Sequence, residues 1–312
     1  MPAEGALSQE ASYPLAVPRL HATSGEPFPR SESHTTVSRG ESAEANNDIR
    51  NLASPNESGT RRYYDALAAD YDRTVHDWRG AVIRQGDALS SLLRERLGRG
   101  TGTLLDCACG IGTQSIGLAL QGYTVLGTDT SSVAISRAMA EADAFGAEVS
   151  FAVADMRELS HEVPGEFDAV ICCDNSLAHM LTEEDLRRAL AAMCAKLRPG
   201  GVLLISLRDY DRHREARPPA TVPICTQDQR GERVTFQRWY WLNEQVYRAD
   251  LFLIERDGRD GWTTTEHAGP VYRAWPRSEV EAIATSVGAV QASWLLPEVS
   301  GYHQPLMSVG VP

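Results

Sequence analysis

Short apolar runs alternate with amphipathic segments through the middle of the chain. Each run is continuously apolar, as strands of a parallel sheet are when both faces are buried, and the intervals between runs carry apolar residues at helical spacing. The predicted strands are 104–106, 123–129, 149–153, 167–174 and 202–207, and the helices between them are 113–120, 132–144 and 183–197. Alternating strands and helices predict an α/β fold with a doubly wound, mostly parallel sheet.

The pattern changes on either side of this segment. Two helices are predicted before it, at 61–72 and 78–97, and Pro276 begins a last helix after it because proline suits the first helical turn. Two final strands are predicted at 290–296 and 305–311. The sheet should therefore gain strands after the alternating segment.

Residues 209–275 interrupt the alternation of strands and helices. Three antiparallel strands are predicted there, at 233–241, 246–255 and 262–272, with turns at Asn243 and 257–261. Thr235, Gln237, Trp239 and Trp241 share one face of the first of these strands, and Val234, Phe236, Arg238 and Tyr240 share the other. We expect an antiparallel β lid that covers a substrate cleft with one face and can meet a second subunit of a homodimer with the other.

Residues 1–57 have almost no apolar periodicity and are rich in Ser, Glu, Pro, Ala and Asn. Such a segment buries too little apolar surface to offset its ordering entropy, so it is predicted to be a disordered tail. Residues 58–312 are then predicted to form a single domain, with 209–275 as the lid insertion.

The stretch from Leu104 to Leu120 reads LLDCACGIGTQSIGLAL and predicts a strand, a tight glycine turn and a helix. Gly110 and Gly112 permit the positive φ and the close ligand approach that such a turn needs. Ser115 occupies the third position of the dinucleotide pattern G-x-G-x-x-G, and the preceding strand ends in Asp106. A carboxylate is awkward beside a pyrophosphate, so the turn is predicted to hold a nucleoside that carries a cation instead.

This stretch resembles the first motif of class I S-adenosylmethionine-dependent methyltransferases, acidic-x-Gly-x-Gly, with Ala108 in place of the first glycine. The resemblance extends over about 61–312. It implies a Rossmann-like sheet of seven strands, the last of them antiparallel, with S-adenosylmethionine as cofactor. In its motifs, the donor contacts fall on Asp106, Ala108, Cys109, Gly110, Gly112, Thr113, Asp129, Thr130, Ser131, Ala154, Asp155, Met156, Cys173 and Asn175.

Two acids at strand ends carry the most specific of these assignments. Asp129 ends the second strand, where a carboxylate can accept both ribose hydroxyls of a nucleoside; a helix N-cap is the alternative, although Thr130 and Ser131 suit that role better. The resemblance implies that Asp155 accepts from the adenine amine and that Met156 packs on the ring. Either could instead be an ordinary strand-end residue.

The N-terminal helices lie across the cofactor mouth in the resembled family, with a tyrosine over the methyl donor and an arginine at its carboxylate. The matching tyrosines are Tyr64 and Tyr71, and Arg84 is the predicted arginine, with Arg79 as its rival. The alternative is that these aromatic residues only pack the helices together.

The acceptor side is less specific in sequence. His179 follows the fourth strand and His303 lies in a late loop, and both are candidate catalytic residues, although a lone histidine often has a structural role. The stretch RDYD, which starts at Arg208, resembles glycine/sarcosine N-methyltransferases and indole methyltransferases of natural-product metabolism. The candidate substrate-binding residues are Arg208, Trp239, Trp241, Tyr272 and Tyr302.

Composition limits the partners and the compartment. The formal net charge of −12, with Lys196 as the single lysine, disfavours a nucleic-acid partner. The six cysteines lack the spacing of a metal site, so no metal is expected. No apolar run approaches the roughly 18 residues of a membrane span, and no signal-peptide core is evident, so a cytoplasmic protein without a membrane partner is expected.

Together these features predict an S-adenosylmethionine-dependent methyltransferase that acts on a small-molecule acceptor. The aromatic residues of the lid favour an aromatic or indole-containing specialised metabolite, methylated on nitrogen or on a ring carbon. A glycine/sarcosine-like amine N-methyltransferase is one alternative. An NAD-dependent oxidoreductase and a non-enzymatic adenosylmethionine-binding protein are alternatives of other classes.

Overall fold

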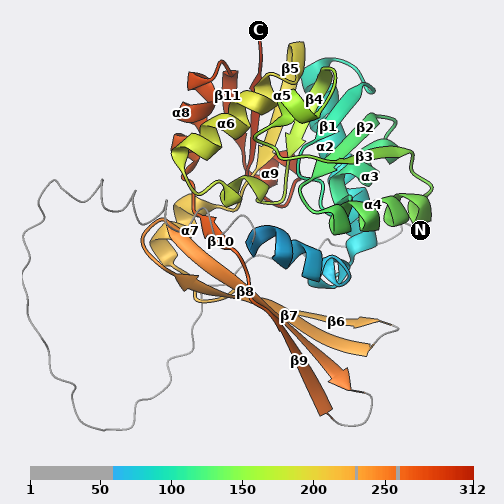
Figure 1. Ribbon diagram of the computed structural model, residues 1–312, viewed down its shortest axis with the longest axis vertical. Helices are drawn as coiled ribbons and strands as arrows, with labels where there is room; N and C mark the ends of the chain where they lie inside the picture. The colour runs from blue at the N-terminus through green and yellow to red at the C-terminus, as the bar shows by residue number, and fades with distance from the viewer. Residues whose placement is uncertain (1–58, 229–230, 258–260) are drawn as a thin grey trace, which may run out of the picture. The chain divides into compact units, whose positions relative to one another are not determined.

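Seven strands form the central sheet in the order β11-β12-β5-β4-β1-β2-β3 (Figure 1). The strands are β1 Thr103–Asp106, β2 Thr124–Asp129, β3 Val149–Val153, β4 Phe167–Cys172, β5 Leu197–Ser206, β11 Val290–Leu295 and β12 Leu306–Gly310. β12 runs antiparallel to both β5 and β11, and the other described pairings are parallel. The predicted mostly parallel sheet of seven strands is confirmed.

The computed structural model describes residues 59–228, 231–257 and 261–312. The predicted tail at 1–57 and most of the predicted turn at 257–261 lie outside the described residues. Among the described helices, none is long and apolar enough to cross a lipid bilayer.

Helices cover both faces of the sheet. They are α2 Trp78–Leu97, α3 Thr113–Leu120, α4 Ser132–Phe145, α5 Leu159–Glu162, α6 Glu183–Cys194, α7 Tyr210–Ala216, α8 Arg277–Ser286 and α9 Pro297–Ser300, with 3-10 turns η1 Tyr71–Thr74 and η2 Ser176–His179. Neighbouring strand residues alternate between two cores: Leu104 packs with α2 and α3, whereas Leu105 packs with α6 and α8. This burial on both faces explains why the strands are continuously apolar.

α2 and α3 cross at a contact between two glycines. A Cβ on Gly86 would lie 2.6 Å from the carbonyl carbon and oxygen of Gly117, and a Cβ on Gly117 would lie 2.3 Å from the carbonyl oxygen of Val82. The helices approach this closely only because neither residue has a side chain. The crossing fixes the start of α3, which follows the predicted glycine turn.

A second, antiparallel sheet follows β5, as predicted, but its strands differ from the prediction. It contains β6 Ile224–Asp228, β7 Gly231–Trp241, β8 Val246–Asp257, β9 Gly261–His267 and β10 Val271–Arg273. β6 and the helix α7 were not predicted, and the single strand expected at 262–272 is two strands. The break occurs where the buried carboxylate of Asp250 accepts the N–H of Gly269 at 2.8 Å and Pro270 follows.

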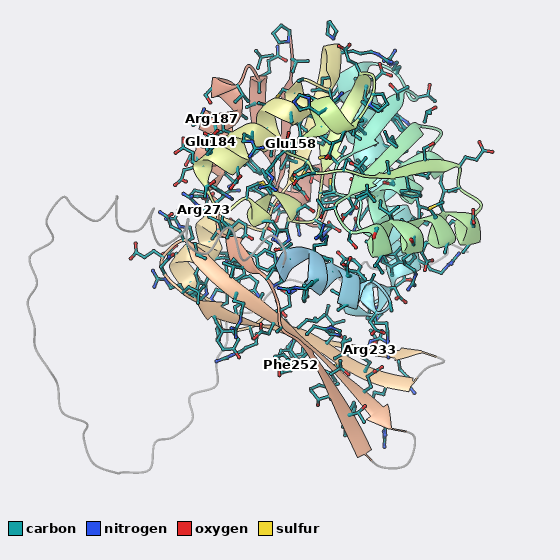
Figure 2. The ribbon with its side chains drawn as sticks, viewed as in Figure 1. Glu158, Glu184, Arg187, Arg233, Phe252 and Arg273 are labelled. Carbon is teal, nitrogen blue, oxygen red and sulfur yellow. The ribbon has the colours of Figure 1, made fainter. Side chains whose placement is uncertain are left out.

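The second sheet, β6 to β10, is called the lid sheet, and it contacts other elements of the described chain. Helical residues 59–67 pack through Tyr63 and Leu67 against Leu251 of β8, and this helix lies between the two sheets (Figure 1). Arg273, at the junction of the two sheets in Figure 2, donates to the carbonyl of Leu181 at 3.1 Å. The lid and the helix at 59–67 therefore pack as a unit.

The faces of β7 are those predicted. The inward face is fixed by Thr235, which donates to the carbonyl of Arg73 at 3.3 Å, and by Trp239, which is buried in the core. Arg238 and Tyr240 are exposed on the outward face. That this outward face meets a second subunit stays a prediction.

Candidate active site

A cavity of about 390 Å³ lies at the carboxyl ends of β1 to β4 and under the helix at 59–67. Its volume falls in the range of roughly 300–1,000 Å³ typical of small-molecule pockets. Its wall is formed by Thr60, Arg61, Tyr64, Ala68, Tyr71, Cys107, Ala108, Cys109, Gly110, Ile111, Thr113, Gln114, Asp129, Thr130, Ala134, Ala154, Asp155, Met156, Arg157, Asp174, Ser176, His179, Met180, Leu181 and Asp185. Open α/β sheets bind ligands at this edge.

The glycine turn brings bare backbone to the cavity. Gly110 and Gly112 have φ of 53° and 93°, in the left-handed region that favours glycine. Apart from its two chain neighbours, no described residue has an atom within 4 Å of a Cβ built on Gly110, so that Cβ would enter the cavity. The N–H of Cys109 donates to the carbonyl of Thr128, which fixes the turn against β2. A ligand can therefore lie directly against Gly110.

Asp129 is positioned by backbone donors on both of its carboxylate oxygens. Oδ2 accepts the N–H of Gly110 at 3.0 Å, and Oδ1 accepts the N–H of Ser131 at 2.9 Å. Burial raises the pKa of Asp129, and the backbone hydrogen bonds act in the opposite direction. Since each carboxylate oxygen has a second lone pair, Asp129 can also accept two ligand hydroxyls.

Among the charged residues of the cavity wall, acids outnumber arginines. The wall carries the carboxylates of Asp129, Asp155, Asp174 and Asp185, and its arginines are Arg61 and Arg157. Arg157 bridges Asp155 at 2.6 Å and Asp185 at 3.2 Å, so its charge is matched within the wall. Such a wall would repel a pyrophosphate and favours a ligand with ammonium or sulfonium groups. A nucleoside without phosphates and with positive groups fits it.

Beyond the carboxylates, Tyr64 and His179 close one end of the cavity. The hydroxyl of Tyr64 lies 3.0 Å from Nε2 of His179, and the imidazole ring packs 4.7 Å from the ring of Tyr272. Burial, and then the charge of Arg208, lower the pKa of His179 to about 3. His179 is therefore neutral at physiological pH and a weak base.

The comparisons with known proteins agree with this geometry. A family model of the methyltransferase domain matches residues 104–201. Over 203 residues the chain is 30% identical to a glycine/sarcosine N-methyltransferase of Aphanothece halophytica, which covers 62% of this chain and 75% of that protein. The chain belongs to the class I S-adenosylmethionine-dependent methyltransferases. The alternative of an NAD-dependent oxidoreductase is therefore dropped.

The methyltransferase is also similar to a second curated protein and to a solved structure. It is 36% identical over 152 residues to a glycine/sarcosine N-methyltransferase of Parasynechococcus marenigrum (strain WH8102), covering 49% of this chain and 52% of that protein. The chain thus spans about half the length of that relative. The crystal structure of Streptomyces venezuelae DesVI has the same fold, with a TM-score of 0.60, 19% identity and coverage of 86% of this chain and 98% of that chain.

The methyltransferase brings most of its predicted donor residues to the cavity. They are Tyr64, Tyr71, Ala108, Cys109, Gly110, Thr113, Asp129, Thr130, Ala154, Asp155 and Met156. The acidic wall and the open space at Gly110 fit S-adenosylmethionine, which is the cofactor of the family. Asp155 already accepts from Arg157 through both oxygens, so its predicted adenine contact shares that carboxylate.

Several predicted donor residues lie behind the wall. Asp106 is fully buried and accepts the hydroxyl of Ser115 at 2.7 Å, so it supports the loop and does not face a ligand. Ser131 caps α4 and donates to Asp65, and Gly112 completes the turn. Cys173 is packed in the core. Asn175 is buried, and its side-chain oxygen accepts the N–H of Arg208.

Neither arginine predicted for the donor carboxylate lies in the wall. The side chain of Arg84 is 66% exposed and pairs with Asp77, and Arg79 stacks on the ring of Phe145 at 4.1 Å. Both belong to the first two turns of α2, and neither side chain lines the cavity. Arg61, from the helix at 59–67, lies in the wall.

On the acceptor side, His179 lines the cavity and His303 does not. The side chain of His303 is 47% exposed, and its Nε2 lies 3.1 Å from the carboxylate of Asp174, which separates it from the cavity. None of Arg208, Trp239, Trp241, Tyr272 and Tyr302 belongs to the described wall. Trp239, Tyr272 and Tyr302 are almost fully buried against other side chains, and Arg208 and Trp241 are half-buried.

Sequence reasoning missed several wall residues. These are Thr60, Arg61, Ala68, Cys107, Ile111, Gln114, Ala134, Arg157, Asp174, Ser176, Met180, Leu181 and Asp185. A signal existed for two of them. Asp174 is an acid just after a buried strand, the same feature that identified Asp129, and Arg61 lies three residues before Tyr64 and so shares its helical face.

Proposed function

We propose that this methyltransferase transfers a methyl group from S-adenosylmethionine to the nitrogen of a small amine that also carries a carboxylate. The observation that carries the proposal is the guanidinium of Arg208, which has no carboxylate partner among the described residues. Such a cation, enclosed beside a cavity built for a positive donor, favours an anionic group on the second ligand.

Arg208 is held in place by aromatic and amide groups. It donates to the hydroxyl of Tyr247 at 3.1 Å and to the side-chain oxygen of Gln237 at 2.8 Å, and its guanidinium lies 4.9 Å from the centre of the Trp239 ring. Its charge is felt by His179, whose pKa it lowers. The positive field at the Tyr64–His179 end therefore attracts a carboxylate.

The relatives support the same class of acceptor. The proteins of Aphanothece halophytica and Parasynechococcus marenigrum are named as glycine/sarcosine N-methyltransferases, and glycine and sarcosine are amines that carry a carboxylate. The stretch RDYD, which starts at Arg208, also resembles glycine/sarcosine N-methyltransferases, so the same residue is singled out by sequence.

S-adenosylmethionine supplies an electrophilic methyl group on a positively charged sulfur. The wall at 108–110, Asp129 and Met156 would hold it, while the acceptor nitrogen must arrive with a free electron pair. Neutral His179 and the Tyr64 hydroxyl can orient that nitrogen by hydrogen bonds. With a pKa of about 3, His179 is a poor general base, so the nitrogen loses its proton to water and positioning supplies the acceleration.

A methyl-transfer panel tests the proposal. Labelled S-adenosylmethionine is incubated with glycine, sarcosine, larger α-amino acids, their methyl esters and indole amines, and product masses are recorded. We expect transfer to the carboxylate-bearing amines and little to their esters. Donor binding without transfer to any amine would favour a non-enzymatic binding protein.

An aromatic or indole acceptor remains the second candidate because Tyr272, Trp239 and Tyr247 form a stacked cluster behind His179, with ring centres 4.7 Å to 5.3 Å apart. These rings fill their own space, since all three are buried. The candidate therefore requires the cluster to open. Transfer to indole amines but not to amino acids would favour it.

A further inference from the structure

We infer that Tyr210 is a positioning residue for the acceptor, because through the hydroxyl of Tyr247 it keeps the guanidinium of Arg208 oriented for a carboxylate. This inference deepens the proposed function and rests on it. Its basis is a pair of buried tyrosine hydroxyls, 2.8 Å apart, one of which accepts from Arg208.

The guanidinium of Arg208 is oriented by two hydrogen bonds to the lid sheet. One terminal N–H group donates to the hydroxyl of Tyr247 in β8 at 3.1 Å, and another donates to the side-chain oxygen of Gln237 in β7 at 2.8 Å. An arginine has five N–H donors in a rigid fork, so donors remain for a carboxylate when two are used in this way. The direction of the fork therefore depends on where these two acceptors lie.

The hydroxyl of Tyr247 needs a second partner to serve as an acceptor. A tyrosine hydroxyl has one proton as well as its lone pairs, and the bond from Arg208 uses a lone pair. Its other partner among the described residues is the hydroxyl of Tyr210, and either oxygen of this pair can donate. Both tyrosines are fully buried, so loss of the Tyr210 hydroxyl would leave Tyr247 with an incompletely bonded group in the core. Tyr247 would then no longer be fixed as the acceptor of Arg208.

A tight turn after β5 places Arg208 and Tyr210 together. The N–H of Tyr210 donates to the carbonyl of Arg208 at 2.7 Å, and α7 begins at Tyr210. The N–H of Arg208 donates to the side-chain oxygen of Asn175 at 3.3 Å, which fixes the same turn against the end of β4. Since α7 lies beside β8 (Figure 1), two residues that are two positions apart reach the same hydroxyl.

The other residues of the stretch RDYD do not share this role. Asp209 is the N-cap of α7, and Asp211 is exposed and pairs with Arg277. Tyr210 faces the core and does not belong to the described wall of the cavity, so any effect on a ligand must pass through Tyr247. The stretch thus combines an arginine for the acceptor with a buried tyrosine that supports it.

Nuclear magnetic resonance of the arginine side chains tests the positioning without an acceptor. The rate of rotation about the Cζ–Nε bond of Arg208 is measured in the full-length protein labelled with ¹³C and ¹⁵N in arginine, and Arg208→Met identifies the signal. We expect Tyr210→Phe to speed this rotation roughly 3- to 10-fold, the effect of losing one hydrogen bond. Phe keeps the shape of the Tyr ring, so the variant should fold.

Matched variants separate this support from a general effect on α7. Asp211→Asn weakens a surface ion pair of the same helix and should leave the rotation of the Arg208 guanidinium unchanged. Tyr247→Phe removes the acceptor itself and should speed the rotation at least as much as Tyr210→Phe. Adding Tyr210→Phe to Tyr247→Phe should have no further effect, because Tyr210 acts through Tyr247.

Kinetics with a carboxylate-bearing amine tests the consequence for the acceptor. Tyr210→Phe should raise KM roughly 3- to 10-fold and change kcat less than about two-fold, because the carboxylate contact is present both before and during methyl transfer. In an Arg208→Met background, the same substitution should not change kcat/KM further. A purely structural effect of Tyr210 would persist in that background.

Two outcomes would overturn the inference. One is an unchanged rotation of the Arg208 guanidinium in Tyr210→Phe, whatever the kinetics show. The other is an equal loss of kcat/KM from Tyr210→Phe in the wild type and in the Arg208→Met background. Faster rotation without transfer to any amine would instead contradict the proposed function and confirm that Tyr210 supports Arg208, so the two failures are distinguishable.

Discussion

Two regions of the site differ in how their residues are positioned. The donor side consists of residues at the carboxyl ends of β1 to β4, and the lid side consists of Arg208 and its partners in β7 and β8. On the donor side, three of the four wall acids, Asp129, Asp155 and Asp174, lie within two residues of the end of a parallel strand. On the lid side, Arg208 leaves β5 and meets Gln237 of β7 and Tyr247 of β8. The first arrangement follows from local sequence and the sheet edge. The second depends on the register of distant strands.

This difference makes the two sides separable by mutation. The donor side should govern affinity for S-adenosylmethionine, and the lid side should govern which acceptor is methylated. A substitution that disturbed both equally would show that the two sides form one cooperative unit.

The largest effect is expected from Arg208→Met, which removes the charge and keeps the apolar stem. We expect kcat/KM for a carboxylate-bearing amine to fall roughly 30- to 3,000-fold, the cost of breaking an enclosed charge pair. Donor affinity measured by calorimetry should change less than about two-fold. Arg238→Met, on the exposed outward face of β7, is the matched control and should leave both quantities unchanged. An equal loss for the amine and for its methyl ester would contradict the role of Arg208.

Asp129→Ala should have the converse effect, which is weaker donor binding with unchanged preference among acceptors. Loss of charge-assisted hydrogen bonds should weaken donor binding by about 1.5–3 kcal/mol, or roughly 10- to 150-fold. Relative rates among acceptors should be preserved when donor is saturating. Asp143→Ala controls for removing a carboxylate, and an unchanged donor affinity in Asp129→Ala would refute the ribose assignment.

The donor side was the more predictable one for a physical reason. Continuous apolar runs mark parallel strands, and a polar residue after such a run must lie at the ligand edge, which identified Asp129. Asp174 was missed because the run was extended through it, whereas β4 ends at Cys172 and the chain then turns by positive φ. No sequence pattern predicts that turn, since Asp and Asn also fit ordinary strand ends.

The lid was predicted as a sheet but not in its details. The turn at Asn243 was predicted from the local sequence between two strand patterns. In the structure its side-chain oxygen accepts the N–H groups of Gln245 and Val246, which is also a local feature. The break between β9 and β10 depends on Asp250, which is 19 positions from Gly269. The sequence analysis took the aromatic residues of the lid as a sign of a flat acceptor, but Trp239, Tyr247 and Tyr272 stack on one another. Sequence periodicity cannot distinguish aromatic residues that bind a ligand from those that pack together.

Asp106→Asn tests whether the buried acid beneath the glycine turn contributes to the pH dependence of the free energy of unfolding. Burial raises the pKa of Asp106 from 3.8 to about 7, and the Ser115 hydroxyl opposes that shift. The folded state therefore binds more protons than the unfolded state between these values, so stability falls as pH rises through this window. Between pH 5 and 7 the wild type should lose up to about 2 kcal/mol that the variant retains. Chemical denaturation at several pH values measures this, and parallel pH profiles for both proteins would contradict it.

The smallest effects compare Arg84, the arginine that the sequence analysis assigned to the donor carboxylate, with Arg61, which the sequence analysis did not consider and which lies in the cavity wall. Arg84 is exposed and pairs with Asp77 at 3.3 Å, a contact of the kind worth less than about 1 kcal/mol, so Arg84→Ala should leave donor affinity within experimental error. Arg61 lies in the cavity wall but is also exposed, so Arg61→Ala should weaken donor binding only roughly two- to five-fold. Calorimetry on both variants under identical salt measures the contrast. A larger loss from Arg84 than from Arg61 would mean that the first turns of α2 move to the cavity when the donor binds, and the donor side would then be less rigid than the strand-end rule implies.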